Sequence, residues 1–459
     1  MWDLKVINTD EPFYLSIANA LERDVKCGIL KSGDKMPTHR ELAKTIGVNV
    51  TTVTRAYQEA EKRGLITATV GKGTFITSDL GRNPALINMD TGSKHLIEMG
   101  LALPLYFIEP DIEPLLNKVI ADRNLRDFMK YTPPQGLYQH RKTGAEWIKQ
   151  LGVDTDADHV IITAGTQHAF NCVLSPVFEA GDKIAVDCIT YPGFKTAARR
   201  LGIRLEAVSM DGEGMIPESL ETVCSHGDIK GVYTVGRLQN PTNSTMSRQR
   251  REDIARIIQR HSLLLIEDDL YGFLAPQGTA PLSALLPDQS FYIAGTSKAF
   301  YSGLRISFLV SPARFYNRIS QAVVDTVMMA PTLNAEIVCK CISSGLAREI
   351  IEAKRNEIKR RANLMLSKLA DYPLLYEPDN LFAWLELPED WSSSSLEAAA
   401  VRSGINVVSS EKFTVGGISP PPNIRISLSG ADNISEYECG LEILRKLLNH
   451  ETVSASAIL

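Results

Sequence analysis

The stretch Phe291-Tyr-Ile-Ala-Gly-Thr-Ser-Lys-Ala-Phe-Tyr-Ser-Gly-Leu-Arg-Ile-Ser-Phe-Leu-Val310 sets one lysine between two apolar runs. Thr296, Ser297 and Ser302 frame Lys298, and Arg305 follows it. Burying a charged lysine without a partner is costly, whereas converting it into an imine creates a useful electrophile. Arg305 could then hold a phosphate on the molecule that forms the imine. A surface turn with a solvated Lys298 is the alternative, and this stretch alone leaves both open.

The composition is that of a folded protein with more than one domain. The 459 residues are 44% hydrophobic and 22% charged, and the formal net charge is −5, which is ordinary for a globular chain of two or three domains. The seven cysteines are scattered, and Cys339-Lys-Cys341 lacks the spacing of a zinc site, so we expect reduced thiols and no metal. Neither a membrane-spanning run nor a signal peptide is evident in the sequence. We therefore expect a cytoplasmic protein without membrane contact.

The first 77 residues predict three short helices. Apolar residues recur at helical spacing from Glu11 to Cys27, and Thr38 with Glu41 forms a capping box that opens a second helix. A third helix opens near Asn49, after the turn at Gly47. This arrangement is a helix-turn-helix, whose last helix enters the major groove of DNA. The core face of the third helix is Val53, Ala56, Tyr57 and Ala60, and its polar face is Thr51, Thr52, Thr54, Arg55 and Gln58.

Residues 65–76 predict a hairpin with a cationic tip at Gly71-Lys-Gly73. The strings Gly33-Asp-Lys-Met-Pro37, Thr51-Thr-Val-Thr-Arg-Ala56 and Gly71-Lys-Gly-Thr-Phe75 resemble the winged helix-turn-helix of the GntR family. The resemblance implies a domain over residues 1–77 that binds double-stranded operator DNA as two copies. We predict DNA contacts from the second helix, the third helix and the hairpin tip, namely Thr38, His39, Arg40, Thr51, Thr52, Thr54, Arg55, Lys72 and Gly73.

Residues 78–96 are polar and aperiodic, so we interpret them as a linker. From Ile97 onward short apolar strands alternate with helices, which predicts an α/β domain with a mainly parallel sheet covered on both faces. The predicted helices include Thr166–Phe178 and Ser247–Arg260. The predicted strands are His159–Thr163, Lys183–Asp187, Lys230–Val235, Leu263–Glu267, Ser290–Ala294 and Arg305–Val310.

Polar and aromatic residues follow these strands, at the ends where parallel sheets bind ligands. Ala164-Gly-Thr-Gln167 opens a helix and makes an anion cradle. Tyr191-Pro-Gly193 offers an aromatic ring, Asn240-Pro-Thr-Asn243 a donor, and Asp268-Asp-Leu-Tyr271 a carboxylate that needs a cationic partner. Each signal alone also fits an ordinary turn or helix start. Together they require one ligand with a phosphate, an aromatic ring, a ring hydroxyl, a basic ring nitrogen and an aldehyde, which is pyridoxal 5′-phosphate.

The series resembles fold-type I aminotransferases of the aspartate aminotransferase superfamily over about residues 97–459. The resemblance implies that Lys298 is the Schiff-base lysine, that Asp268 binds the pyridine nitrogen, and that Tyr191 lies against the ring. It also implies a homodimer, in which Tyr131 reaches the phosphate of the neighbouring subunit. The ring oxygen would be held by Asn240 and Tyr271, and the phosphate by Gly165, Thr166, Gln167, Ser297 and Arg305.

Three further expectations concern the second half of the chain. Gly295 stands where the superfamily has a hydroxyl residue, so we expect Thr296 to replace that phosphate contact. Arg425, in the predicted strand Asn423–Ser429, matches the residue that binds the α-carboxylate of amino acids, and an arginine paired within the domain is the alternative. The basic residues Lys354-Arg355 and Lys359-Arg-Arg361 are expected to form a solvated helix face.

A winged helix followed by an aminotransferase-like domain resembles the MocR branch of the GntR regulators. It implies a transcriptional regulator that senses an amine, an amino acid or the vitamin itself through an aldimine on Lys298. A working aminotransferase with an accessory DNA-binding domain, and a DNA-binding protein with a cofactor-free scaffold, are the alternatives. Within residues 97–459 we expect a large subdomain at about 130–330 and a small one at about 97–129 and 331–459.

Overall fold

The computed structural model describes residues 12–26, 29–30, 34–63, 65–69, 73–76, 96–121, 125–276 and 278–451. Most of the predicted linker and the predicted hairpin tip, including Lys72, lie outside these ranges. Within them, no helix is long and apolar enough to cross a membrane.

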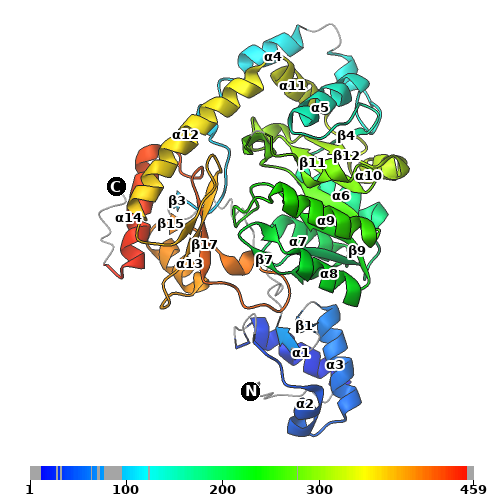
Figure 1. The fold of residues 1–459 in the computed structure, drawn as a ribbon, viewed down its shortest axis with the longest axis vertical. Coiled ribbons are helices and arrows are strands. Elements are labelled where there is room, and N and C mark those ends of the chain that lie inside the picture. The colour runs from blue at the N-terminus through cyan, green and yellow to red at the C-terminus, as the bar shows by residue number, and fades with distance from the viewer. Residues whose placement is uncertain are drawn as a thin grey trace.

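In its described residues the N-terminal domain has three helices and an antiparallel hairpin (Figure 1, blue). Its elements are α1 (Phe13–Lys26), α2 (His39–Ile46), α3 (Val50–Lys62), β1 (Ile66–Thr69) and β2 (Gly73–Ile76). The capping box is present, since the Thr38 hydroxyl accepts the Glu41 N–H at 3.3 Å and the Glu41 carboxylate accepts the Thr38 N–H at 2.8 Å. Gly47 ends α2 with a φ of 70°, which glycine adopts without strain. The predicted core face of α3 is buried, from Val53 to Ala60.

A seven-stranded mixed sheet forms the centre of the second domain, in the order β4-β12-β11-β10-β9-β5-β6. Only β12 runs antiparallel to its neighbours, so the prediction of a mainly parallel sheet is confirmed. The strands are β4 (Val160–Thr163), β5 (Lys183–Asp187), β6 (Arg204–Val208), β9 (Ile229–Thr234), β10 (Leu264–Asp268), β11 (Ser290–Gly295) and β12 (Ser307–Val310). A short hairpin, β7 (Met210–Asp211) and β8 (Gly214–Met215), follows β6.

Helices cover both faces of this sheet, which explains why its strands are apolar throughout. One face packs against α6 (Thr166–Val177), α7 (Pro192–Arg200) and α10 (Tyr316–Val327) through side chains such as Phe170, Phe194 and Ile319. The other packs against α5 (Tyr138–Gln150), α8 (Pro217–His226) and α9 (Arg248–Arg260).

A second, smaller sheet has the order β13-β14-β17-β16. Its strands are β13 (Leu374–Leu375), β14 (Phe382–Glu386), β16 (Val408–Ser409) and β17 (Asn423–Ser427), and its helices are α13 (Ser393–Arg402) and α14 (Ile434–Leu448). Beside it β3 (Ile97–Glu98) pairs in parallel with β15 (Ile405–Asn406). The long helix α12 (Leu346–Lys368), yellow in Figure 1, runs from this unit toward α11 (Thr332–Ser343) and α4 (Glu113–Ile120).

The expectation of a solvated basic face on α12 is wrong for two residues. Lys354 is buried and its Nζ lies 2.7 Å from Glu109. Arg361 is also buried, donating to Glu357 at 2.9 Å and to the carbonyls of Leu428 and Ala431. Positions seven apart share one helix face, and this face packs against the rest of the domain, so both cations needed internal partners.

Candidate functional site

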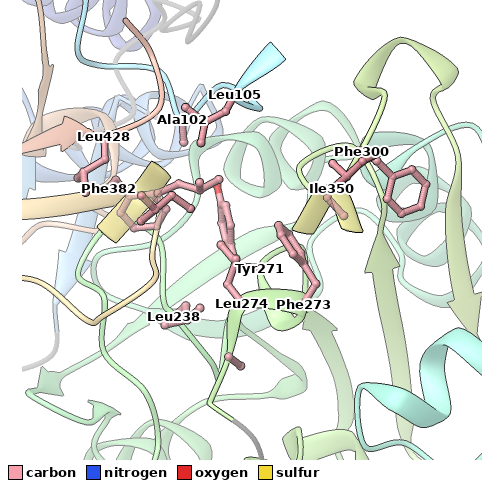
Figure 2. Packing of buried hydrophobic residues seen from close by; sticks show 14 of the residues in the cluster. Ala102, Leu105, Leu238, Tyr271, Phe273, Leu274, Phe300, Ile350, Phe382 and Leu428 are labelled. Atoms are coloured by element: carbon pink, nitrogen blue, oxygen red, sulfur yellow. The ribbon is translucent and has the colours of Figure 1, made fainter. Parts of the chain in front are cut away.

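The residues predicted to hold a cofactor converge at the carboxyl ends of the parallel strands. Asp268 is the last residue of β10, and Lys298 follows β11. Gln167, at the start of α6, donates to the Tyr191 hydroxyl at 3.2 Å. Arg425, from the middle of β17, donates to Asn240 Oδ1 at 2.7 Å. Elements from both sheets therefore build one site, and Figure 2 shows Tyr271 among the buried apolar side chains of the adjoining core, which include Phe382.

Lys298 is partly buried and donates from Nζ to the carbonyl of Ala102. Burial, together with the nearby charges of Arg425, Arg305 and Lys354, lowers the pKa of Lys298 to about 7. About half of such a lysine is uncharged at neutral pH, and the uncharged amine is the form that attacks a carbonyl. The alternative of a surface turn with a solvated Lys298 is therefore wrong.

Asp268 is a buried carboxyl with one unsatisfied oxygen. Its Oδ2 accepts a hydrogen bond from the Tyr233 hydroxyl at 3.3 Å, while Oδ1 has no hydrogen-bond partner among the residues that the structure describes. Burial raises the pKa of Asp268 to about 7. A buried polar atom without a partner costs free energy unless a ligand supplies that partner, so Oδ1 marks the place for a cationic or N–H group.

An anion cradle lies between the start of α6 and Arg305. Gly165 has a φ of 87°, and a Cβ there would stand 2.5 Å from Arg305 Nη2. Arg305 also donates to the Ser297 hydroxyl at 3.0 Å. The Thr166 hydroxyl is buried and has no hydrogen-bond partner within the described part of the chain. An unpartnered hydroxyl and a guanidinium beside a helix N-terminus suit a phosphate group.

The expectation that Thr296 replaces the missing hydroxyl at position 295 is wrong. The Thr296 hydroxyl donates to the carbonyl of Ile306 at 2.8 Å and is thereby used within the loop. A Cβ on Gly295 would instead lie 2.6 Å from the Thr166 hydroxyl. Gly295 therefore makes room for Thr166, whose hydroxyl lies in the space where a side chain at position 295 would begin.

The aromatic and amide residues of the site lie close together. Burial and the charge of Asp268 raise the pKa of the Tyr191 phenol, while the hydrogen bond from Gln167 and the charges of Arg425 and Arg305 oppose the rise. Tyr271 is buried with its ring edge-on to Phe382 at 5.2 Å. Because Asn240 Oδ1 accepts from Arg425, its Nδ2 is the group left to donate to a ligand.

Tyr131 does not take part in this cluster. Its side chain is 84% exposed and forms no hydrogen bond among the described residues. The neighbouring Thr132 donates from its N–H to the Met329 sulfur at 3.1 Å, so Tyr131 lies near the end of α10. Exposed Met328 follows α10, and exposed Met129 precedes Tyr131. This leaves a partly apolar surface next to the site.

The predicted DNA-contacting residues have two kinds of environment. Arg40 and Thr51 are exposed, and Thr52 is half-buried. The remaining described residues also make contacts within the domain. Thr38 caps α2, Gly73 begins β2, and His39 packs edge-on to Tyr57 at 4.8 Å. Thr54 donates to the Val50 carbonyl at 3.0 Å, and the Arg55 guanidinium lies 4.5 Å from the Tyr14 ring centre.

Two residues of the site were not foreseen. Tyr233, within β9, was assigned only as part of an apolar strand, yet it donates to Asp268. His168 accepts the N–H of Ala164 on Nδ1 at 3.0 Å, and its Nε2 lies 2.6 Å from the Thr326 hydroxyl, which fixes the loop that carries Gly165. His168 directly follows the predicted cradle, so its position was the available signal.

Comparisons with known proteins agree with this architecture. Residues 114–439 match the family "Aminotransferase class I and II", and residues 13–76 match "Bacterial regulatory proteins, gntR family". The HTH-type transcriptional regulator YdeF of Bacillus subtilis is 34% identical, over 98% of this chain and 97% of its own length. The vitamin B6 salvage pathway transcriptional repressor PtsJ of Salmonella typhimurium is 24% identical, over 90% and 93%.

The crystal structure of the α-aminoadipate aminotransferase LysN from Thermus thermophilus shares the fold. Its TM-score is 0.71 at 23% identity, covering 86% of this chain and 98% of that one. The protein is therefore a DNA-binding regulator in which a GntR-type winged helix is fused to a fold-type I aminotransferase-like domain. It belongs to the MocR branch of the GntR regulators. The aminotransferase family to which its larger domain belongs depends on pyridoxal 5′-phosphate.

Proposed function

We propose that the chain regulates transcription by holding pyridoxal 5′-phosphate on Lys298 and responding to an amine, an amino acid or the vitamin itself. When bound, the cofactor supplies an aldehyde that condenses reversibly with primary amines. The observation that carries the proposal is the unpartnered Oδ1 of buried Asp268, in the same site as a lysine whose pKa is about 7. The protonated ring nitrogen of the cofactor is the partner that such a carboxylate requires.

The remaining residues fit the other groups of the cofactor. The unpartnered Thr166 hydroxyl and the Arg305 guanidinium suit its phosphate. The free Nδ2 of Asn240 and the Tyr271 hydroxyl suit the ring oxygen, and Tyr191 suits the ring face. The residues proposed to hold the cofactor are Lys298, Asp268, Asn240, Tyr271, Tyr191, Gly165, Thr166, Gln167, Ser297 and Arg305.

Arg425 is proposed to receive the carboxylate of an amino-acid effector. Its guanidinium is buried between Phe382 and Phe413, 5.5 and 5.0 Å from their ring centres. It donates to Asn240, a proposed cofactor residue, which brings the effector and cofactor positions together. Burial lowers the pKa of Arg425, and the Tyr271 and Tyr191 phenols and Glu98 oppose this shift. Within the described ranges no carboxylate is bonded to the buried guanidinium, so its positive charge is available to a ligand carboxylate.

The working unit is proposed to be a homodimer. Tyr131 is highly exposed, and Met129 and Met328 add exposed apolar area around it. Burial of such side chains against a second copy is favourable. A dimer would also present two winged helices to two half-sites of an operator, which strengthens binding by local concentration.

A working aminotransferase is the second candidate function. This candidate is supported by Lys298, Asp268 and Arg425 lying in one site and by the fold shared with LysN, an aminotransferase. The DNA-binding domain would then be an accessory.

Visible absorbance separates the two candidates. The full-length protein, loaded with pyridoxal phosphate, is titrated with a panel of amines and amino acids. A spectral shift with one compound, without turnover when a 2-oxo acid is added, is expected of a regulator. Sustained turnover would favour the enzyme. A protein with no visible band dependent on Lys298 would contradict both.

A further inference from the structure

Two backbone carbonyls of one short stretch cover the two proposed ligand-binding cations. We name this stretch, residues 96–105, the strap. The carbonyl of Gly100 accepts from Arg425 Nη2 at 2.7 Å and from Nε at 3.2 Å. The carbonyl of Ala102 accepts from Lys298 Nζ. Nε and Nη2 form an edge of the guanidinium that can grip a carboxylate with two parallel hydrogen bonds, so the Gly100 carbonyl occupies donors that a ligand carboxylate would use.

Glu98 holds the strap in this position. Its Oε1 accepts the N–H groups of both Gly100 and Leu101 at 2.7 Å. Asn406 Nδ2 donates to both Glu98 carboxylate oxygens at 2.9 Å. Two main-chain hydrogen bonds also hold the strap. The Met99 N–H donates to the Asn406 carbonyl at 2.9 Å, and the Ser427 N–H donates to the Met99 carbonyl at 2.6 Å. The Glu98 side chain thus orients the peptide groups whose carbonyls face the site.

We propose that the strap is a built-in competitor for the carboxylate of the ligand, and that Glu98 is the positioning residue that sets its strength. The proposal rests on the assignment of Arg425 to a ligand carboxylate. A ligand that takes the Nε and Nη2 edge of Arg425 must displace the Gly100 carbonyl. Loading of Lys298 likewise removes the donor that Ala102 uses. The ligand carboxylate thus releases the strap at Gly100, whereas loading of Lys298 by the cofactor releases it at Ala102.

The position of the strap in the sequence relates its release to the DNA-binding domain. Figure 2 shows Ala102 and Leu105 near Tyr271 and Phe382, and both strap residues are buried. The strap is the first described stretch after the winged helix, to which residues 77–95 join it covalently. In the sequence the strap stands between the DNA-binding domain and the proposed ligand-binding residues, which is where a coupling between the two sites would pass.

The test compares Glu98→Ala with Glu98→Gln in the full-length protein loaded with pyridoxal phosphate. Glutamine removes the negative charge, which itself acts on Arg425, but it keeps an oxygen that can accept the two strap N–H groups. Alanine removes both the charge and the grip. Maleate serves as the probe because it has carboxylates and no amine, and its Kd is measured by titration calorimetry.

We expect Glu98→Ala to bind maleate about tenfold more tightly than Glu98→Gln, the equivalent of about 1.4 kcal/mol. Equal or weaker binding by Glu98→Ala would overturn the proposal. If no variant binds maleate, or if binding survives Arg425→Met, the assignment of Arg425 and the strap proposal both fail. The cofactor assignment is tested separately, by the visible band and its loss in Lys298→Ala.

Hydrogen exchange in the wild-type protein provides a second measurement if Glu98→Ala does not fold. Saturating maleate is expected to accelerate exchange of the amides of Gly100 and Leu101, while residues 382–386 of β14 serve as the internal control. Unchanged or slower exchange at Gly100 and Leu101 would contradict displacement of the strap.

Discussion

Replacement of Asp268 by asparagine should have opposite effects on the empty and the loaded protein. Asparagine keeps the shape of the side chain but cannot carry the negative charge that a protonated ring nitrogen requires. Cofactor affinity should therefore fall. In the empty protein the same change removes a buried carboxylate whose Oδ1 has no partner, and this should stabilise the fold.

The magnitude follows from the pKa of Asp268, which burial raises from 3.8 to about 7. A rise of roughly three in pKa corresponds to about 4 kcal/mol. This is the upper limit for the increase in the free energy of unfolding that Asp268→Asn should produce. Because the unfolded carboxyl ionises near pH 4 and the folded one near pH 7, the gain is absent below about pH 4 and complete above about pH 7. The Asp268→Asn advantage should therefore grow as the pH rises between these values.

Urea unfolding of the cofactor-free protein at pH 5 and pH 8, followed by circular dichroism, measures this difference. Asp269→Asn is the matched control one residue away. Asp269 forms a buried ion pair with Arg237, and removal of one partner should cost about 3–5 kcal/mol. Loss of stability in Asp268→Asn at pH 8, or a gain that does not depend on pH, would refute the reasoning.

Three further outcomes are expected. Arg305→Gln should weaken binding of pyridoxal phosphate by roughly tenfold or more and leave pyridoxal unaffected, because the lost charge-assisted bonds go to the phosphate; equal losses for both in equilibrium dialysis would contradict the cradle. The rate at which the visible band forms should rise with pH to a midpoint at about 7, the pKa of Lys298, and Arg425→Met should move the midpoint upward; a midpoint near that of a free lysine would be the contrary result. Arg40→Gln should reduce the salt dependence of DNA binding by about one phosphate contact; an unchanged slope in fluorescence anisotropy would remove Arg40 from the interface.

The sequence was informative where chemistry is carried by side chains at strand ends. Asp268 and Lys298 could be predicted because parallel strands bring their carboxyl ends to one edge. The strap could not be predicted, because the groups through which it contacts the site are backbone carbonyls, which every residue type has. In addition, Gly100 and Arg425 lie 325 positions apart. The burial of Lys354 and Arg361 was missed for a related reason. A helix sequence shows which residues share a face but not which face other elements cover.

The central claim is that occupancy of Lys298 alters the DNA-binding domain. Its most direct test is the affinity of the full-length protein for a duplex that it has selected from a random library, measured with and without pyridoxal phosphate. The wild-type affinity should change by several-fold on loading, as expected for a coupling of about 1–3 kcal/mol, and the affinity of Lys298→Ala should not. Equal affinities for the loaded and empty wild-type protein, with and without effector candidates, would contradict the claim.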